Sequence, residues 1–342
     1  MEICIMKKQI LVIILLVVLI ASTFTFAACS GASNGLEYTL LDDGTYAVSG
    51  IGKCKDSALV IPKNHKRKPV TAIAELAFAE CKGLESVAFE EGSQVTHIDN
   101  YAFQYCTNIV SVTLPQGFQT FGEGVFYRCE SLTDISIPNS VTSLGCMIFA
   151  DCTGLVTVTI PSSVTDLGKS TFMHCTSLTS VNIPDGVTTL GNGLFMGCTS
   201  LTTFTIPSGI TSIGESVFTN CTNLTTVVFP SGLTIIGNYA FSNCASLQNV
   251  TIPNTVVSIG ASTFARCNLL TSITIPSSVT FISWAAFARC ENLTSVTFDD
   301  PNAWYRTQTK GATDGPTLTL TNPSQNATYL TEIYDEYYWY KR

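Results

Sequence analysis

The chain has 342 residues, of which 46% are hydrophobic and only 12% are charged, and its formal net charge is −8 at pH 7. An acidic chain repels the phosphates of nucleic acids and of anionic lipids, so nucleic acid is excluded as a partner. The mean hydropathy of +0.31 has two sources. One is an apolar N-terminal segment, and the other is a recurring set of Ile, Leu, Val and Phe positions.

Residues 1–28 are predicted to be an export signal. Lys7 and Lys8 precede an unbroken apolar run over 10–21, a positive region followed by an apolar region of signal-peptide length. Residues 30–35, Ser-Gly-Ala-Ser-Asn-Gly, follow and predict a flexible tether.

The segment Phe26-Ala27-Ala28-Cys29 resembles a bacterial lipobox, although Phe26 stands where Leu is usual. That resemblance implies that Cys29 becomes a diacylated N-terminus, with a tether over 29–35 and a location on the extracellular face of the membrane. The alternative is plain cleavage after Ala28, which gives a secreted protein.

Residues 36–62 are predicted to form an N-terminal cap. Two β-type runs flank Asp42-Asp43-Gly44, the pattern of a hairpin, and a degenerate first repeat runs from Cys54 to Pro62. Next comes the only dense basic run, Lys63-Asn-His-Lys-Arg-Lys68, which predicts a short loop of solvated charge.

A repeat of 23 residues fills positions 63–300. Cysteines recur 25 residues apart at the first step and 23 residues apart thereafter, and a Phe lies three residues before each one. The cysteines are Cys81, Cys106, Cys129, Cys152, Cys175, Cys198, Cys221, Cys244, Cys267 and Cys290. A unit this short cannot bury its own apolar face, so we expect stacked units with parallel strands and one buried Phe ring in each.

Each position of the unit has a predicted role. Leu178, Val181 and Ile183 have the L-x-x-L-x-L spacing of a strand with an apolar inner face, which Pro184 ends. Val187 and Leu190 are expected to turn a second apolar face inward along the return path, the part of each unit that follows the proline. Gly191 and its equivalents are expected where the backbone needs positive φ or lies very close to a neighbouring backbone. The segment through Phe195 is expected to form a short helical or 3₁₀ turn.

The motif Ile-Gly-x-x-x-Phe-x-x-Cys-x-x-Leu-x-x-Val-x-Ile-Pro resembles the BspA-type, or treponemal-type, leucine-rich repeat over residues 54–300. The resemblance implies a β-rich α/β solenoid, a right-handed array of about ten units with a parallel sheet. It also implies a cell-surface protein that takes part in adhesion, with host matrix proteins such as fibronectin and fibrinogen or other cells as partners.

Residues 301–342 break the repeat and are predicted to form a C-terminal cap. This segment is rich in aromatic residues. They either pack as a cap over the last unit or form an aromatic patch that binds a ligand. The candidate patch consists of Trp304, Tyr334, Tyr337, Tyr338, Trp339 and Tyr340.

No catalytic, cofactor-binding or metal-binding residues are predicted. The three histidines fall in separate units, the sequence has no C-x-x-C pair, and no phosphate or dinucleotide motif is present. The recurring cysteines are expected to be buried structural thiols, with Cys146 the more exposed one.

The outward side chains of the predicted strands form the candidate binding face, a nearly uncharged row of hydroxyls and amides. They are Ser111, Thr113, Asp134, Ser136, Thr157, Thr159, Ser180, Asn182, Thr203, Thr205, Thr226, Asn249, Thr251, Ser272 and Thr274. Three functions remain open. The sequence favours a surface interaction protein without enzymatic activity. A structural envelope lipoprotein and a carbohydrate-binding or enzymatic accessory protein are the alternatives.

Overall fold

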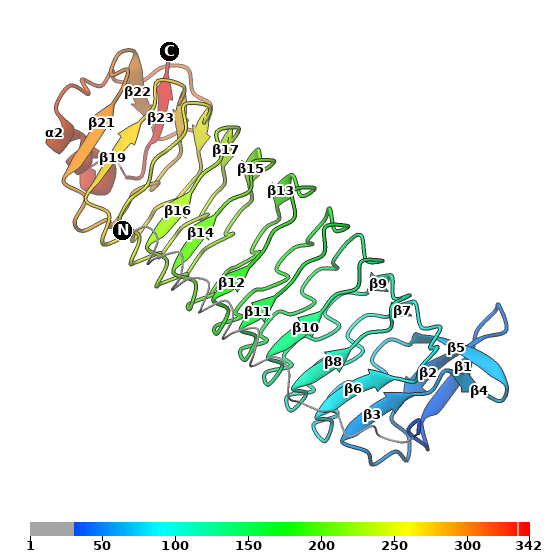
Figure 1. The fold of residues 1–342 in the computed structure, drawn as a ribbon. Coiled ribbons are helices and arrows are strands. Elements are labelled where there is room, and N and C mark those ends of the chain that lie inside the picture. The colour runs from blue at the N-terminus through cyan, green and yellow to red at the C-terminus, as the bar shows by residue number, and fades with distance from the viewer. Residues whose placement is uncertain (1–30, 334) are drawn as a thin grey trace, which may run out of the picture. The chain divides into compact units, whose positions relative to one another are not determined.

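The computed structural model describes residues 31–333 and 335–342. Ser33–Arg342 form one compact unit, a stack of similar turns of chain with a cap at each end (Figure 1). The predicted leucine-rich-repeat solenoid is confirmed. Most turns contain two short strands, and each turn of the repeat has one arc that carries the Phe-x-x-Cys sequence.

The first strands of successive turns form the first ladder, whose pairs are parallel. The paired residues are 28 and 25 residues apart in the first two pairs and 23 residues apart thereafter, as in Asp134 with Ser111. This is the pairing predicted from the L-x-x-L-x-L spacing. The strands are β3 (Ala58–Ile61), β6 (Ser86–Phe89), β8 (Ser111–Thr113), β10 (Asp134–Ser136), β11 (Thr157–Val158), β12 (Ser180–Val181), β14 (Thr203–Thr205), β16 (Thr226–Val228), β19 (Ser272–Ile275) and β21 (Ser295–Phe298).

A second parallel ladder runs along the return path, where the sequence predicted only an inward apolar face. Val187 and Leu190 are buried as expected, and the residue before each buried Leu or Ile pairs with the next turn, as Thr189 does with Ser212. The strands are β2 (Tyr46–Gly50), β5 (Lys68–Ile73), β7 (His97–Ile98), β9 (Thr120–Phe121), β13 (Thr189–Leu190), β15 (Ser212–Ile213), β17 (Ile235–Ile236), β18 (Ser258–Ile259) and β20 (Phe281–Ile282).

The arcs do not contain the helical turn that the sequence predicted. The residue two places before each Phe and the residue two places after it adopt positive φ, as Tyr101 (55°) and Tyr105 (59°) do around Phe103. The N–H groups of these three residues donate to carbonyl oxygens of the next arc at 2.8–2.9 Å. Alternate N–H groups thus bond between arcs, while those of Gln104 and Cys106 bond within the arc, to the Tyr101 and Phe103 carbonyl oxygens at 3.1 and 3.2 Å.

The recurring glycines allow close approach between turns rather than positive φ. A Cβ on Gly145 would lie 2.8 Å from the Gly122 carbonyl oxygen, and one on Gly191 would lie 2.8 Å from that of Gly168. Of the seven equivalent glycines from 122 to 260, Gly168 alone has positive φ. The sequence left both reasons open, and close approach is the general one.

The Phe rings form the predicted spine through the stack. From Phe78 to Phe287, consecutive rings lie with centroids 5.0–5.9 Å apart and with planes 3–19° from parallel. Each of the rings from Phe78 to Phe264 is fully buried. The spine therefore buries one large apolar side chain per turn and fixes the distance between turns.

Each end of the stack has a cap. At the N-terminus, β1 (Glu37–Leu40) and β2 form the predicted antiparallel hairpin, and β4 (Asn64–His65) pairs with β5. At the C-terminus, β22 (Trp304–Thr307) and β23 (Tyr338–Lys341) pair with each other, and helix α2 (Pro323–Thr328) and the π-helical turn η1 (Tyr329–Ile333) lie between them in the chain.

The C-terminal cap makes hydrogen bonds to the last turn of each ladder and to the last arc. Strand β23 pairs with β20 at the end of the second ladder. The Asn326 side chain donates to the Val296 carbonyl of β21 at 2.9 Å, which closes the first ladder. The Ala285 N–H of the last arc donates to the Asp335 carbonyl.

Replacing Phe172 with Ala should lower the free energy of unfolding by about 3–5 kcal/mol, because the ring is fully buried between those of Phe149 and Phe195 and its removal leaves a cavity. Urea denaturation followed by circular dichroism measures the change. The exposed Ser180→Ala serves as control, with an expected change within about 0.5 kcal/mol. Equal stability of Phe172→Ala and the native chain would contradict the role given to the spine.

Candidate functional site

The candidate binding face lies along the outward side of the first ladder. Ser111 and Thr226 are half-buried, and the other thirteen residues of the predicted set are exposed. Inward residues alternate with them and are buried, as Val158 is between Thr157 and Thr159. The alternation that the sequence predicted for these strands therefore holds, and the structure places the predicted residues in two rows across the turns.

The chemistry of this first-ladder face is uniform. Asp134 is its only charged side chain, and hydroxyls fill most other positions. Asn182 has a structural task as well, because its side chain accepts from the Ile160 N–H at 3.0 Å and donates to the Ile160 carbonyl at 2.9 Å. Val228, which is 52% exposed, adds an apolar position to the rows. The face lacks an acid–base pair and cations, so contact by hydrogen bonding is what it offers.

The second ladder presents another outward face, which the sequence reading did not identify. Its exposed strand residues begin with Thr120 and Thr189 and become apolar toward the C-terminal end, where Ile235 is 46% exposed and Phe281 is half-buried. In the sequence, the outward residue of this face is the one directly before each buried Leu or Ile of the return path. It was missed because no strand was expected there.

The recurring cysteines bond to the Phe spine. From Cys106 to Cys290, each Sγ donates to the carbonyl oxygen of the Phe one turn earlier, at 3.0–3.3 Å. Burial raises the pKa of these thiols, to about 12 for Cys221. A neutral, hydrogen-bonded and enclosed thiol is a poor nucleophile and a poor metal ligand. All described cysteines are free, as expected of structural thiols.

In the folded mature protein, iodoacetamide should modify Cys146 well before the buried ladder thiols such as Cys175. Cys146 is half-buried at the surface, whereas Cys175 is fully buried and the pKa of its thiol is raised well above the ordinary value by burial. Peptide mass spectrometry after a timed exposure measures both rates, and the urea-unfolded protein provides the control in which the two react alike. Equal rates in the folded protein would contradict the enclosed ladder.

The aromatic residues of the C-terminus divide between packing and surface. Trp304 and Trp339 are each only 1% exposed and pack on Phe298 of the last turn, with ring centroids 5.2 and 6.4 Å away. Tyr337, Tyr338 and Tyr340 are half-buried. Tyr334 lies outside the described residues. An aromatic surface could therefore draw only on part of the candidate patch.

The rings that remain at the surface are stacked on one another. Tyr340 lies 4.9 Å from Phe281 on one side and 5.5 Å from Tyr305 on the other, and the Tyr340 hydroxyl accepts from the Gly311 N–H at 2.6 Å. Tyr338 lies 6.3 Å from Phe281, nearly parallel to it. Because the faces of these rings pack against one another, little flat aromatic surface is left on which a sugar ring could stack.

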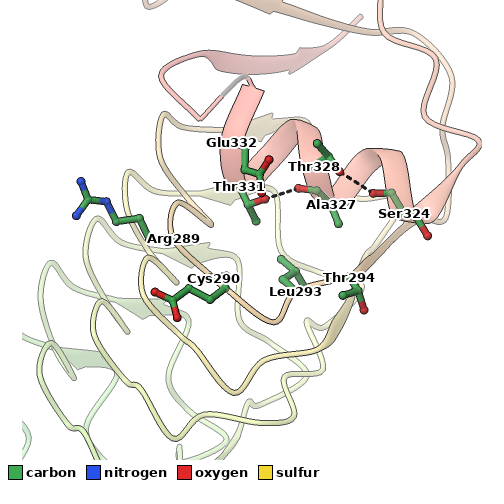
Figure 2. A pocket seen from close by; sticks show the side chains of 10 residues that line it. Arg289, Cys290, Leu293, Thr294, Ser324, Ala327, Thr328, Thr331 and Glu332 are labelled. Atoms are coloured by element: carbon green, nitrogen blue, oxygen red, sulfur yellow. Dashed lines mark hydrogen bonds between the residues drawn. The ribbon is translucent and has the colours of Figure 1, made fainter.

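A shallow pocket of about 520 Å³ lies between the last turn and the helical segment of the cap (Figure 2). Hydroxyls and carboxylates line it, but the Thr331 hydroxyl donates to the Ala327 carbonyl and that of Thr328 to the Ser324 carbonyl. Arg289 and Glu332 lie at its rim in Figure 2. Two of the hydroxyls that line the pocket, those of Thr328 and Thr331, are therefore already paired with the backbone of their own helical segment.

One cluster on the arcs was not identified from the sequence. The position two places after each Phe holds Tyr105, Arg128, Asp151 and His174 in consecutive turns. The Arg128 guanidinium lies 5.4 Å from the centre of the Tyr105 ring, and its Nε is 3.7 Å from the Asp151 carboxylate. His174 Nδ1 is 3.1 Å from the same carboxylate. Comparing this position down the repeat would have shown the cluster.

The pair of His174 and Asp151 resembles two parts of a catalytic triad, but the third part does not join it. Cys175 follows His174 in the chain, yet its Sγ donates inward to the Phe149 carbonyl at 3.1 Å. Within residues 31–333 and 335–342, no group of three metal-ligating side chains occurs either. We therefore regard the arc cluster as cross-turn packing with an exposed polar edge.

The predicted anchor residue Cys29 lies outside the described residues. The tether predicted over 29–35 includes Ser33, which is buried and exchanges two hydrogen bonds with Val60 of β3, at 2.9 and 3.0 Å. The packed chain thus begins four residues after Cys29. Among the helices of the described residues, none has the length and apolar character needed to cross a membrane.

A family model described as the BspA type leucine-rich repeat region, with six copies, matches residues 71–202 and 188–305. These ranges cover more than half of the chain and include the arcs and both ladders. The chain belongs to this family. No curated protein matches the chain significantly.

Solved structures of bacterial leucine-rich repeat proteins share the fold. A leucine-rich repeat protein from Bacteroides ovatus is 28% identical over 80% of this chain and 72% of its own, with a TM-score of 0.71. A leucine-rich repeat protein of T. pallidum is 26% identical over 64% of this chain and 91% of its own, with a TM-score of 0.51. The pneumococcal vaccine antigen PcpA is 20% identical over 80% and 82%, with a TM-score of 0.54, and shows the fold alone.

Proposed function

We propose that this BspA-type protein is an interaction protein without enzymatic activity, anchored by lipid at Cys29 to the outer face of a bacterial membrane. It binds a protein partner, on a host matrix or on another cell, through the first-ladder face. The observation that carries the proposal is the continuity of that face, which presents two rows of mostly hydroxyl side chains over eight consecutive turns with a single acid, Asp134.

The rest of the structure supports contact rather than catalysis. The backbone groups of the ladders are paired between turns, the recurring cysteines from Cys106 on are bonded into the core, and the pair of His174 and Asp151 lacks a nucleophile. What is left for a partner is side-chain hydroxyls and scattered apolar positions such as Val228. A broad, neutral, fixed surface of this kind suits a large protein partner, since many weak contacts sum without a large cost of desolvating charge.

The double variant Thr159→Glu/Thr205→Glu should weaken binding of the mature protein to immobilised fibronectin or fibrinogen, or to whole bacteria, by about tenfold or more. Each added carboxylate would be desolvated in the interface without a partner, and about 1.4 kcal/mol corresponds to tenfold in affinity. Surface plasmon resonance or a cell-adhesion assay measures the loss.

The matched control is Thr120→Glu/Thr189→Glu. Both residues are exposed strand threonines, and they lie on the second ladder instead. Binding of the control should equal that of the native protein. If the control loses as much as the first-ladder variant, or if neither variant loses affinity, the partner does not bind the first-ladder face.

Replacing Cys29 with Ala should move the protein from the membrane fraction to the medium, because the diacylated cysteine is the proposed anchor. Mass spectrometry of the mature native N-terminus should show Cys29 carrying a diacylglycerol group. Ser30→Ala is the control and should leave fractionation unchanged. A mature chain that begins at an unmodified Cys29 would show that the protein is secreted.

A further inference from the structure

The basic run of the sequence forms an exposed hairpin at the N-terminal cap, which we call the basic hairpin (residues 64–69). His65 of β4 pairs with Lys68 of β5, and Lys66 and Arg67 form the two-residue turn with φ of 47° and 64°. The side chains at 66, 67 and 68 are all exposed. In the described part of the chain, no acid forms an ion pair with any of the three.

The base of this hairpin is held firmly. The His65 ring stacks on Tyr38 with a centroid distance of 3.8 Å, and its edge meets Tyr46 at 4.9 Å. Burial, and then the neighbouring Lys66, lower the pKa of His65, so this ring is a neutral packing group at neutral pH. The Val70 N–H donates to the Lys63 carbonyl at 2.9 Å. The cations therefore project from a fixed platform rather than from a loose loop.

The charge of the chain is divided unequally along the stack. Residues 31–75 carry six Lys or Arg and five Asp or Glu, a balance of +1. Residues 76–342 carry nine Lys or Arg and nineteen Asp or Glu, a balance of −10. The stack is thus slightly positive at its N-terminal end and strongly negative over its remaining length. An anionic surface would attract the first part and repel the second.

The positive end is also the end nearest to the proposed anchor. Ser33 is packed against Val60, only three residues before the start of the basic run at Lys63. The Lys53 N–H donates to the Gly35 carbonyl at 2.9 Å, which places another exposed lysine beside the point where the packed chain begins. Ser33 is the fourth residue after Cys29, and an extended chain of that length spans at most about 14 Å.

We propose that the basic hairpin binds the anionic phosphate headgroups of the membrane that carries the lipid anchor, while the acidic stack is repelled from that surface. The inference rests on the anchoring at Cys29 proposed above. A basic residue at an anionic membrane surface contributes about 1 kcal/mol, and its attraction falls off within a Debye length of about 8 Å. The hairpin alone would bind weakly, and the proposed lipid anchor would add to this attraction by keeping the N-terminal cap near the membrane.

The test tethers the mature chain from residue 30 to vesicles through an N-terminal histidine tag and a nickel-chelating lipid. The vesicles are phosphatidylcholine with or without phosphatidylglycerol, and a soluble amine-acetylating reagent reports the exposure of each lysine by mass spectrometry. Acetylation of Lys66 and Lys68 should fall about fivefold when phosphatidylglycerol is present, since 1 kcal/mol corresponds to that factor. In 1 M salt the protection should disappear, because the Debye length shrinks to about 3 Å.

Lys169 and Lys310, which are exposed on the acidic part of the stack, serve as internal controls and should react at the same rate on both vesicles. Unchanged rates at Lys66 and Lys68 would overturn the proposal. Equal protection of Lys169 and Lys310 would overturn it too, because the acidic stack would then lie on the surface as well.

A variant separates charge from hairpin structure. Lys66→Asn/Arg67→Gly removes two cations, and Asn-Gly is a favoured pair for a two-residue hairpin turn with positive φ, so the hairpin should persist. Protection of Lys68 should then be lost, whereas Lys169→Gln/Lys310→Gln, with the same change in charge, should retain it. Because the tag replaces the lipid, this result does not depend on whether Cys29 is acylated in cells, which the fractionation of Cys29→Ala decides.

Discussion

The contact on which the structure depends is the one between each Phe-x-x-Cys arc and the arc before it. The Phe ring lies on the preceding ring, and the Cys thiol donates to the carbonyl of that preceding Phe. Both contacts hold across the first step of 25 residues as well as across the steps of 23 residues, as for Phe78 with Phe103 and for Cys106 with the Phe78 carbonyl. The fixed spacing of Phe and Cys within each arc therefore carries the stack, and the 23-residue interval repeats that spacing along the chain.

The fold could be predicted because its main signals are local and repeated. The spacing of Leu178, Val181 and Ile183, the proline that follows them and the Phe–Cys interval each appear in nearly every unit. The second ladder and the left-handed residues of the arcs could not be predicted in this way. Tyr101 and Arg128 have positive φ and their N–H groups donate to the next turn, but their identities carry no mark of either.

The candidate site was predictable in its composition and less so in its surroundings. Outward Thr and Ser residues follow from strand alternation, but the use of Asn182 to close a gap in the ladder depends on a neighbouring turn. The C-terminal aromatics show the same limit. Trp304 and Trp339 fill the end of the core, and nothing in their spacing distinguished that task from ligand binding. Function in such a chain resides in the residues that packing does not use, and these are few.

The arcs also have a direction. In each arc, alternate N–H groups donate to carbonyl oxygens of the next arc toward the C-terminus. In the last arc, the Ala285 N–H donates to the Asp335 carbonyl of the cap instead. Any arc can therefore follow any other, because donors always meet acceptors at the junction. Loss or duplication of a whole unit in the gene would leave both caps and every junction satisfied. Proteins of this design can therefore change in length by the loss or duplication of whole units.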